Sequence, residues 1–155
     1  TEFLEMRSLF LANPVLALGV LAWLIAQVIK VLLNVVQRNT WDLKILLSSG
    51  GMPSSHSAFV CAIAGSIAQM HCLNSTLFAL AAALALVVMY DACNVRRAAG
   101  EQAKILNYLL GHLDQISPEL AGKALQELLG HTPLQVFMGA LLGIAVGTGG
   151  GFWLQ

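Results

Sequence analysis

Long apolar segments alternate with short polar segments along this chain. The apolar segments cover about residues 14–36, 54–70, 77–95 and 133–153. A helix of about 20 apolar residues crosses the hydrocarbon core of a bilayer, so these lengths are typical of transmembrane helices. The pattern predicts an all-α fold, a polytopic membrane helical bundle with about four transmembrane helices, and a single domain over residues 1–155.

Short amphipathic helices are expected between the third and fourth segments. After Arg96 and Arg97, polar residues recur among apolar ones as far as Leu110, which predicts that the third helix continues out of the membrane. A second amphipathic helix is expected over residues 119–129, ending at Gly130.

Composition supports the membrane interpretation. The chain is 57% hydrophobic and 10% charged, whereas soluble domains carry about 25% charged residues. The net charge is zero and basic runs are absent, so we expect no nucleic-acid partner. The three cysteines fit neither a disulfide framework nor a zinc site, and we expect no metal or other cofactor. Glu2, Glu5 and Arg7 do not form the basic region of a signal peptide, so no cleavable targeting segment is expected.

One polar stripe interrupts the first apolar segment. Gln27, Lys30 and Asn34 recur at helical spacing in its second half. Polar groups inside a membrane span are costly and normally face a cavity or a partner, so Lys30 is a candidate ligand for an anion. Lys30 could instead extend to the headgroups, and the stripe could line a carrier for ions or small solutes.

The stretch from Gly50 to Ser57 precedes the second span. Its two glycines permit a tight turn, and Pro53 suits the first position of a helix. Ser54 and Ser55 bring hydroxyls to a helix N-terminus, whose unpaired N–H groups form a ready anion site. His56 would lie in the first turn, where it could pass a proton to a leaving oxygen. The alternative is a capped helix start in which His56 is merely polar.

The cationic residues between the spans fall on one side of the membrane. Arg7 is alone on the other side. By the positive-inside rule the cationic side is cytoplasmic or stromal, in a bacterial inner membrane or a plastid membrane. Asp91 and the turns that carry His56 and His131 are expected on this side, together with the cationic residues Arg38, Lys44, Arg96, Arg97, Lys104 and Lys123.

Glycines recur every fourth residue in the last span, at Gly139, Gly143 and Gly147. Such a ladder lets two helix backbones approach closely. It predicts a tight bundle, and its face is also a candidate surface for a homo-oligomer.

The residues gathered at the cationic side suit phosphoryl transfer, which needs cations, a nucleophile and an acid. Arg96 and Arg97 offer planar forks for phosphate, and one of the two is expected to face the site. Either His131 or His56 could be the nucleophile and the other the acid. Asp91 could orient an imidazole or pair with an arginine. Interfacial anchoring and salt bridging is the alternative for Asp91 and the arginines.

Four blocks of the sequence resemble the divergent branch of the type 2 phosphatidic acid phosphatase superfamily. They are Gly51–Ser57 (GMPSSHS), Val88–Ala92 (VMYDA), Val95–Gly100 (VRRAAG) and Leu129–Pro133 (LGHTP). The resemblance covers about residues 13–150. It implies a helical core and metal-independent hydrolysis of a phosphomonoester through a phosphohistidine.

The resemblance also implies roles for individual residues. The Pro-Ser-Gly-His motif resembles residues 53–56, which makes His56 the acid and Ser54 and Ser55 phosphate ligands. The Ser-Arg-x5-His-x3-Asp motif makes His131 the nucleophile, but its arginine and aspartate positions hold Leu125 and Gln135. We expect Arg96 or Arg97 and Asp91 to replace them. The Lys-x6-Arg-Pro motif aligns on Lys30, with Gln37 in place of the arginine.

The function that the resemblance implies is that of an integral membrane phosphatase acting on a lipid phosphate monoester. Phosphatidylglycerophosphate is preferred as substrate because a cytoplasmic site suits an intermediate of phospholipid synthesis; phosphatidate and polyprenyl phosphate fit the same geometry. The alternative is a catalytically inactive membrane assembly or interaction protein of the same fold, which the departures at Leu125 and Gln135 favour.

Overall fold

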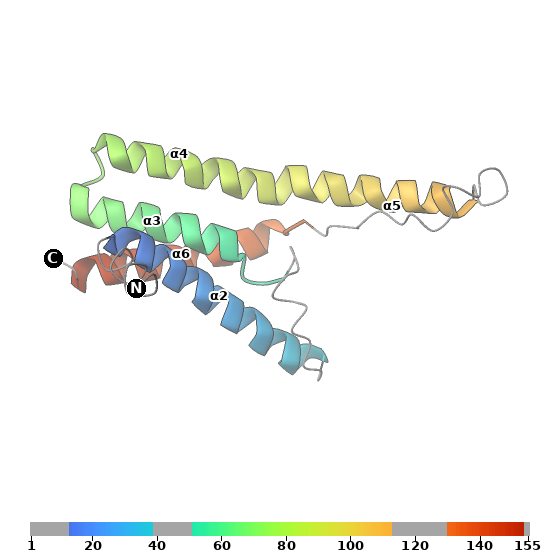
Figure 1. Cartoon of the computed structure of the whole chain (residues 1–155), viewed down its shortest axis with the longest axis horizontal. Coiled ribbons are helices and arrows are strands. Elements are labelled where there is room, and N and C mark those ends of the chain that lie inside the picture. The colour runs from blue at the N-terminus through green and yellow to red at the C-terminus, as the bar shows by residue number, and fades with distance from the viewer. Residues whose placement is uncertain (1–12, 39–50, 113–129, 154–155) are drawn as a thin grey trace, which may run out of the picture.

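The structure is a computed structural model, and it describes residues 13–38, 51–112 and 130–153 (Figure 1). Within these ranges the regular elements are helices. In chain order they are α2 (Pro14–Arg38), α3 (Ser55–His71), α4 (Thr76–Tyr90), the π-helical turn η2 (Asp91–Val95), α5 (Arg96–His112) and α6 (Pro133–Trp153). The predicted all-α membrane bundle is confirmed.

Three stretches of the described chain are long and apolar enough to cross a membrane. They are Pro14–Gln37, Thr76–Gly111 and Pro133–Phe152. The second of these includes α4, η2 and most of α5, so the third helix does continue without interruption into the amphipathic segment. The remaining expected span is α3, whose 17 residues stand at the lower end of transmembrane length.

Helix α3 forms the core of the bundle. It packs against α2, α4 and α6, and Figure 1 shows it between α4 and the pair formed by α2 and α6. Along α4, in contrast, only Ala81 and Ala85 are buried among the described neighbours. Leucines such as Leu80 and Leu86 on α4 are each 65% exposed. Such an apolar outer surface suits contact with lipid chains rather than water.

The glycine ladder of α6 packs directly on α3. A Cβ atom added at Gly139, Gly143 or Gly147 would overlap the carbonyl oxygens of Ser54, Ala58 and Ala62, respectively. The two backbones are therefore in contact over two helical turns, as the spacing predicts for a tight bundle. The same face was also a candidate surface for a homo-oligomer. Within the described chain it is covered by α3, and an association between subunits stays a prediction.

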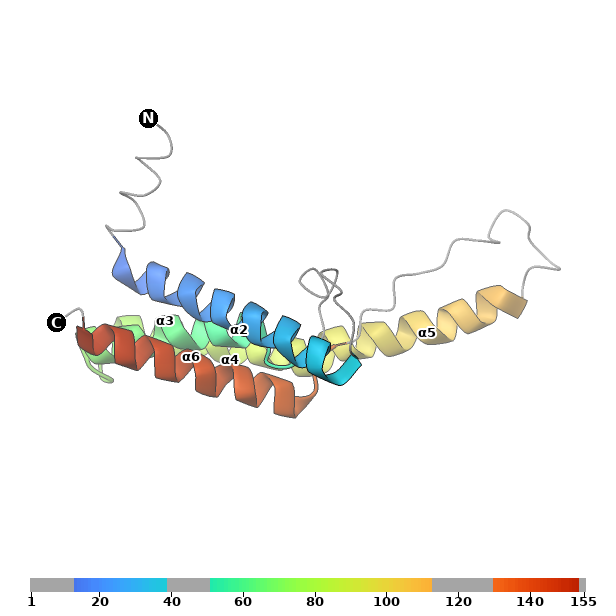
Figure 2. The ribbon, with the colours of Figure 1, turned by 90° about the horizontal axis from the view of Figure 1, so that it is seen from below.

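The ends of the helices that carry polar residues gather at one end of the bundle. The C-terminal end of α2, the N-termini of α3 and α6, and the junction of α4 with η2 lie there (Figure 2). One local expectation was wrong. Pro53 does not open α3, because Ser54 is the N-cap and the helix begins at Ser55.

Several expectations fall outside the described residues. These are the lead-in over 1–12 with its lack of a targeting segment, the polar segment with Lys44, the amphipathic helix over 119–129, and the positions of Lys123 and Leu125.

The glycine contact predicts a position-specific effect of adding one methyl group. In Gly143→Ala the new Cβ meets the Ala58 carbonyl, the Ala62 nitrogen and Cys61, so overpacking should destabilise the protein by about 1 to 3 kcal/mol. Gly149→Ala is the matched control because nothing lies within 4 Å of its added Cβ. Thermal unfolding in detergent should show a lower Tm for the first variant alone. Equal Tm values for the two variants would contradict the packing described.

Candidate functional site

Serine hydroxyls build the N-terminus of α3. The Ser54 hydroxyl accepts the backbone N–H of Ser57 at 3.4 Å, and the Ser57 hydroxyl donates to Ser54 Oγ at 2.9 Å. Both serines are fully buried. The next two N–H groups, of Ser55 and His56, cannot bond within the helix and have no acceptor among the described residues. They are free to hold an anion, and the helix dipole favours one there.

The start of α6 is fixed against the start of α3. The backbone N–H of Ser54 donates to the carbonyl of Gln135 at 2.9 Å. One turn further along α6, Gly139 allows the helix to contact the Ser54 carbonyl. His131, four residues before Gln135, is therefore held close to the first turn of α3, where His56 lies.

Gln135 closes the first turn of α6. Its Oε1 accepts the N–H of Thr132 at 3.0 Å, while the Thr132 hydroxyl accepts the N–H of Gln135 at 3.4 Å. This reciprocal pair is a capping box. Gln135 occupies the position at which the superfamily motif has an aspartate, and here its side chain serves the helix start. The Thr-x-x-Gln spacing was a sequence signal for this role that the motif comparison did not use.

The π-helical turn η2 fixes the backbone of His131. Within this turn the N–H of Arg96 donates to the carbonyl of Asp91, five residues earlier. The carbonyl of Ala92 accepts the N–H of His131 at 3.1 Å. Beside it, Gly130 lies against the backbone of Arg97 so closely that a Cβ would overlap it. The segment before α6 is thus joined to the junction of α4 and α5.

The same turn aligns an ion pair. Arg96 Nε lies 2.8 Å from Asp91 Oδ2. Residues five apart on a regular α-helix point about 140° away from each other. The i→i+5 bonding of a π-turn places them one above the other, so the wider turn is what lets the carboxylate reach the guanidinium. Of the two expected roles for Asp91, the structure shows pairing with an arginine.

Lys30 enters the site from α2. It is 3% exposed, and its aliphatic chain lies against Gly51, where a Cβ would stand 3.1 Å from Cγ and Cδ. Gln27 and Asn34, on the same face, are each 7% exposed. The polar stripe therefore faces the interior of the bundle. No described carboxylate lies within ion-pairing distance of the Lys30 ammonium.

His131 is the second histidine of the site, and its imidazole is buried. It is 3% exposed, and neither ring nitrogen has a hydrogen-bond partner among the described residues. Burial is the largest cause that lowers the pKa of His131, to about 4. The charges of Lys30, His56 and Arg96 act on it in the same direction. The imidazole is therefore neutral at physiological pH and keeps a lone pair for a nucleophilic attack.

The structure brings most of the expected site residues together. Lys30 and Arg96 act electrostatically on both His56 and His131, and Asp91 joins the group through Arg96. Ser54 and Ser55 are buried at the same helix start, but the Ser54 hydroxyl is engaged in the cap.

Arg97 stands apart from this group. Its side chain is exposed, and its charge is not among those that act on the imidazoles. Arg96 is also exposed, but it pairs with Asp91 and its charge acts on both imidazoles, so of the adjacent arginines it is the candidate phosphate ligand. The described residues contain no group of three or more side chains that could hold a metal ion.

The lowered pKa of His131 predicts a pH-dependent stability. Between pH 6.5 and 4 the unfolded chain binds a proton at His131 that the folded chain does not, so the free energy of unfolding should fall as pH falls through this window. The loss should be at most about 3 kcal/mol, at 1.4 kcal/mol per pKa unit. The Tm of wild type and His131→Gln in detergent, measured from pH 7 to 4, checks this. The Gln variant should be less sensitive to pH, whereas the control His71→Gln, at the exposed far end of α3, should follow wild type.

Comparison with known proteins agrees with the resemblance seen in the motifs. A profile of the Divergent PAP2 family matches residues 11–146. The uncharacterized membrane protein YuiD of Bacillus subtilis (strain 168) is 42% identical over 144 residues, which cover 86% of this chain and 91% of the relative. No solved structure matches the chain significantly. The chain is an integral membrane protein and belongs to the Divergent PAP2 family.

Proposed function

We propose that this protein is a metal-independent lipid phosphate phosphatase that hydrolyses a phosphomonoester headgroup through a phosphohistidine. The observation that carries the proposal is the state of His131. It is a buried, neutral imidazole with both nitrogens unbonded among the described groups, and it lies in the field of Lys30, His56 and Arg96. A nucleophile without hydrogen bonds, surrounded by cationic groups, suits attack on an anionic phosphorus centre.

In the first chemical step, one ring nitrogen of His131 attacks phosphorus as the bond from phosphorus to the headgroup oxygen breaks. The imidazolium form of His56 donates a proton to that oxygen and becomes neutral, so the lipid leaves as a neutral alcohol. Lys30, Arg96 and the N–H groups of Ser55 and His56 offset the charge on the non-bridging oxygens. Asp91 acts indirectly, by holding the Arg96 guanidinium in place.

In the second step, His56 takes a proton from water, and the oxygen of that water attacks the phosphohistidine. The bond from nitrogen to phosphorus breaks, inorganic phosphate leaves, and His131 returns to its neutral form. His56 therefore alternates between acid and base, which its exposed position in the first turn of α3 permits.

The membrane setting supports a lipid as the substrate. The proposed residues lie at one end of the bundle, where the apolar spans meet the polar helix ends, so a headgroup could react while its tails stay in the bilayer. Arg96, Arg97 and Lys104 follow α4 at this end, which supports a cytoplasmic or stromal orientation. Phosphatidylglycerophosphate is the preferred substrate for that orientation, and phosphatidate and polyprenyl phosphate are the other candidates.

A specific observation favours a second candidate, a catalytically inactive membrane assembly protein. Gln135 caps α6 and Asp91 pairs with Arg96, so no described carboxylate hydrogen-bonds either imidazole. Loss of the group that orients a catalytic histidine lowers activity by several orders of magnitude in other enzymes.

Substitution of the two histidines separates these candidates. If the protein is a phosphatase, His56→Ala and His131→Ala should each lower kcat by at least about 100-fold, because each removes an acid–base or nucleophilic group. Only His131→Ala should abolish the phosphoenzyme that is trapped by acid quench with a 32P-labelled lipid. His56→Ala should retain it. If the wild-type protein releases no phosphate from any of the three lipids, the phosphatase proposal fails and the assembly role is the candidate that is left.

The two adjacent arginines offer a matched pair of variants. Arg96→Gln should lower kcat/KM by about 100- to 1,000-fold, the usual cost of losing a group that stabilises transition-state charge. Arg97→Gln makes the same chemical change one residue away, where the charge does not act on the imidazoles, and should cost less than about 10-fold. Steady-state hydrolysis in mixed micelles gives both values. A larger loss in Arg97→Gln would reverse the assignment.

A further inference from the structure

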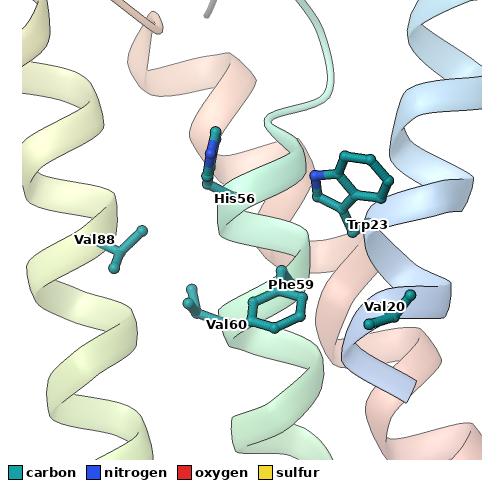
Figure 3. Close-up of a pocket in the computed structure, with 6 residues that line it drawn as sticks. All are labelled: Val20, Trp23, His56, Phe59, Val60 and Val88. Atoms are coloured by element: carbon teal, nitrogen blue, oxygen red, sulfur yellow. The ribbon is translucent and has the colours of Figure 1, made fainter. Parts of the chain in front are cut away.

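An apolar cavity of about 350 Å³ opens beside His56. It is lined by Val20 and Trp23 of α2, His56, Phe59 and Val60 of α3, and Val88 of α4. Figure 3 shows α3 as its floor, with the side chains of α2 and α4 on either side and the imidazole at one end. Its size is at the lower end of small-molecule sites. Its lining is almost wholly hydrocarbon, so it cannot serve a polar solute.

The cavity runs from the cationic end of the bundle toward the membrane interior. On α2, Val20 lies ten residues before Lys30, which is about 15 Å along the helix axis. Trp23 is 37% exposed, so this wall is open to the surroundings of the bundle rather than closed by another described helix. In a membrane those surroundings are lipid chains.

The charge at the mouth identifies the occupant. The apolar lining ends at His56, which lies in the field of Lys30 and Arg96 and next to the free N–H groups of α3. A ligand that complements both the apolar lining and the cationic mouth has a hydrocarbon chain at one end and a compact anion at the other. Neither a soluble phosphate ester nor a neutral lipid satisfies both parts.

From this arrangement we infer that the cavity beside His56 binds one hydrocarbon chain of a lipid phosphomonoester and thereby positions its phosphate at the histidines. The inference rests on the proposed function for the fate of the phosphate, but binding itself requires no hydrolysis. It implies that the protein selects its ligand by chain and head together, because the two contacts are parts of one continuous site.

Trp23 provides a direct probe of the cavity. The other tryptophans of the chain are Trp41 and Trp153. In protein with Trp41→Phe and Trp153→Phe, reconstituted in nanodiscs, Trp23 fluorescence is measured against increasing mole fractions of brominated lipids. The ligand is a non-hydrolysable phosphonate analogue of phosphatidate with brominated chains. Brominated phosphatidylglycerol, an anionic phosphodiester, is the comparison. The phosphonate should half-quench Trp23 at a mole fraction at least fivefold lower than the diester.

Filling the cavity should remove this preference. Val88→Phe and Val20→Phe narrow the cavity from opposite walls. In each variant, the mole fractions of the two lipids that half-quench Trp23 should differ by less than twofold. Val87→Phe makes the same change at a neighbouring position on α4 that is 67% exposed and outside the cavity, so it should keep the wild-type preference. Two filling variants are used so that misfolding of one, seen by size exclusion, leaves the other to be measured.

The outcomes separate this inference from the proposed function. Equal quenching by both lipids in the parent protein, or a preference that survives a folded filling variant, overturns the chain site, whatever the hydrolysis assay shows. A preference that the filling variants remove supports it, even if the protein releases no phosphate. If the filling variants remove the preference and the protein releases no phosphate, the phosphatase proposal fails, and the protein is a lipid-binding protein.

Discussion

The contact between the backbones of α6 and α3 is the constraint on which the site depends. His56 and His131 are separated by 75 positions, and a bundle of larger side chains would keep their helix starts apart. Gly139, Gly143 and Gly147 let α6 lie on the carbonyls of α3, and the Ser54–Gln135 hydrogen bond then fixes the register of the two helix starts. The ladder runs from Gly139, beside Ser54, to Gly147, beside Ala62, so the close packing begins next to the proposed chemistry and continues away from it.

Much of this arrangement could be predicted from the sequence because it follows from periodicity. The apolar runs predicted the helices, and the glycine spacing predicted their tight packing. The polar stripe of α2 predicted that Lys30 faces the interior of the bundle. Chain topology then required both histidine-bearing turns to lie at one end. The partner of the ladder could not be predicted, since a glycine face fits a helix of its own chain or of another chain equally well.

The details that periodicity does not encode were missed. Nothing in Asp91–Val95 distinguishes a π-turn from an α-helix, yet this turn aligns Asp91 with Arg96 and presents the Ala92 carbonyl to His131. Gln135 was read only as a departure from a catalytic motif, whereas locally it completes a capping box. Both cases have the same physical origin. Which local hydrogen bonds form depends on the donors and acceptors that the neighbouring segment presents, and periodicity does not encode these.

The buried charge of Lys30 and the neutral imidazole of His131 are connected by the binding of an anion. Lys30 is almost fully buried without a described counter-ion, and a buried cation that lacks a partner costs several kcal/mol. Burial is the main reason that His131 stays neutral, and the charges of Lys30, His56 and Arg96 act in the same direction. An anion bound between them would offset that cost, so part of the binding energy comes from relief of an unfavourable unliganded state. An inactive descendant would gain stability from losing Lys30 or from acquiring a carboxylate beside it. The buried charge of Lys30 thus supports the proposal that the site binds an anion, because a bound anion would supply the missing counter-charge.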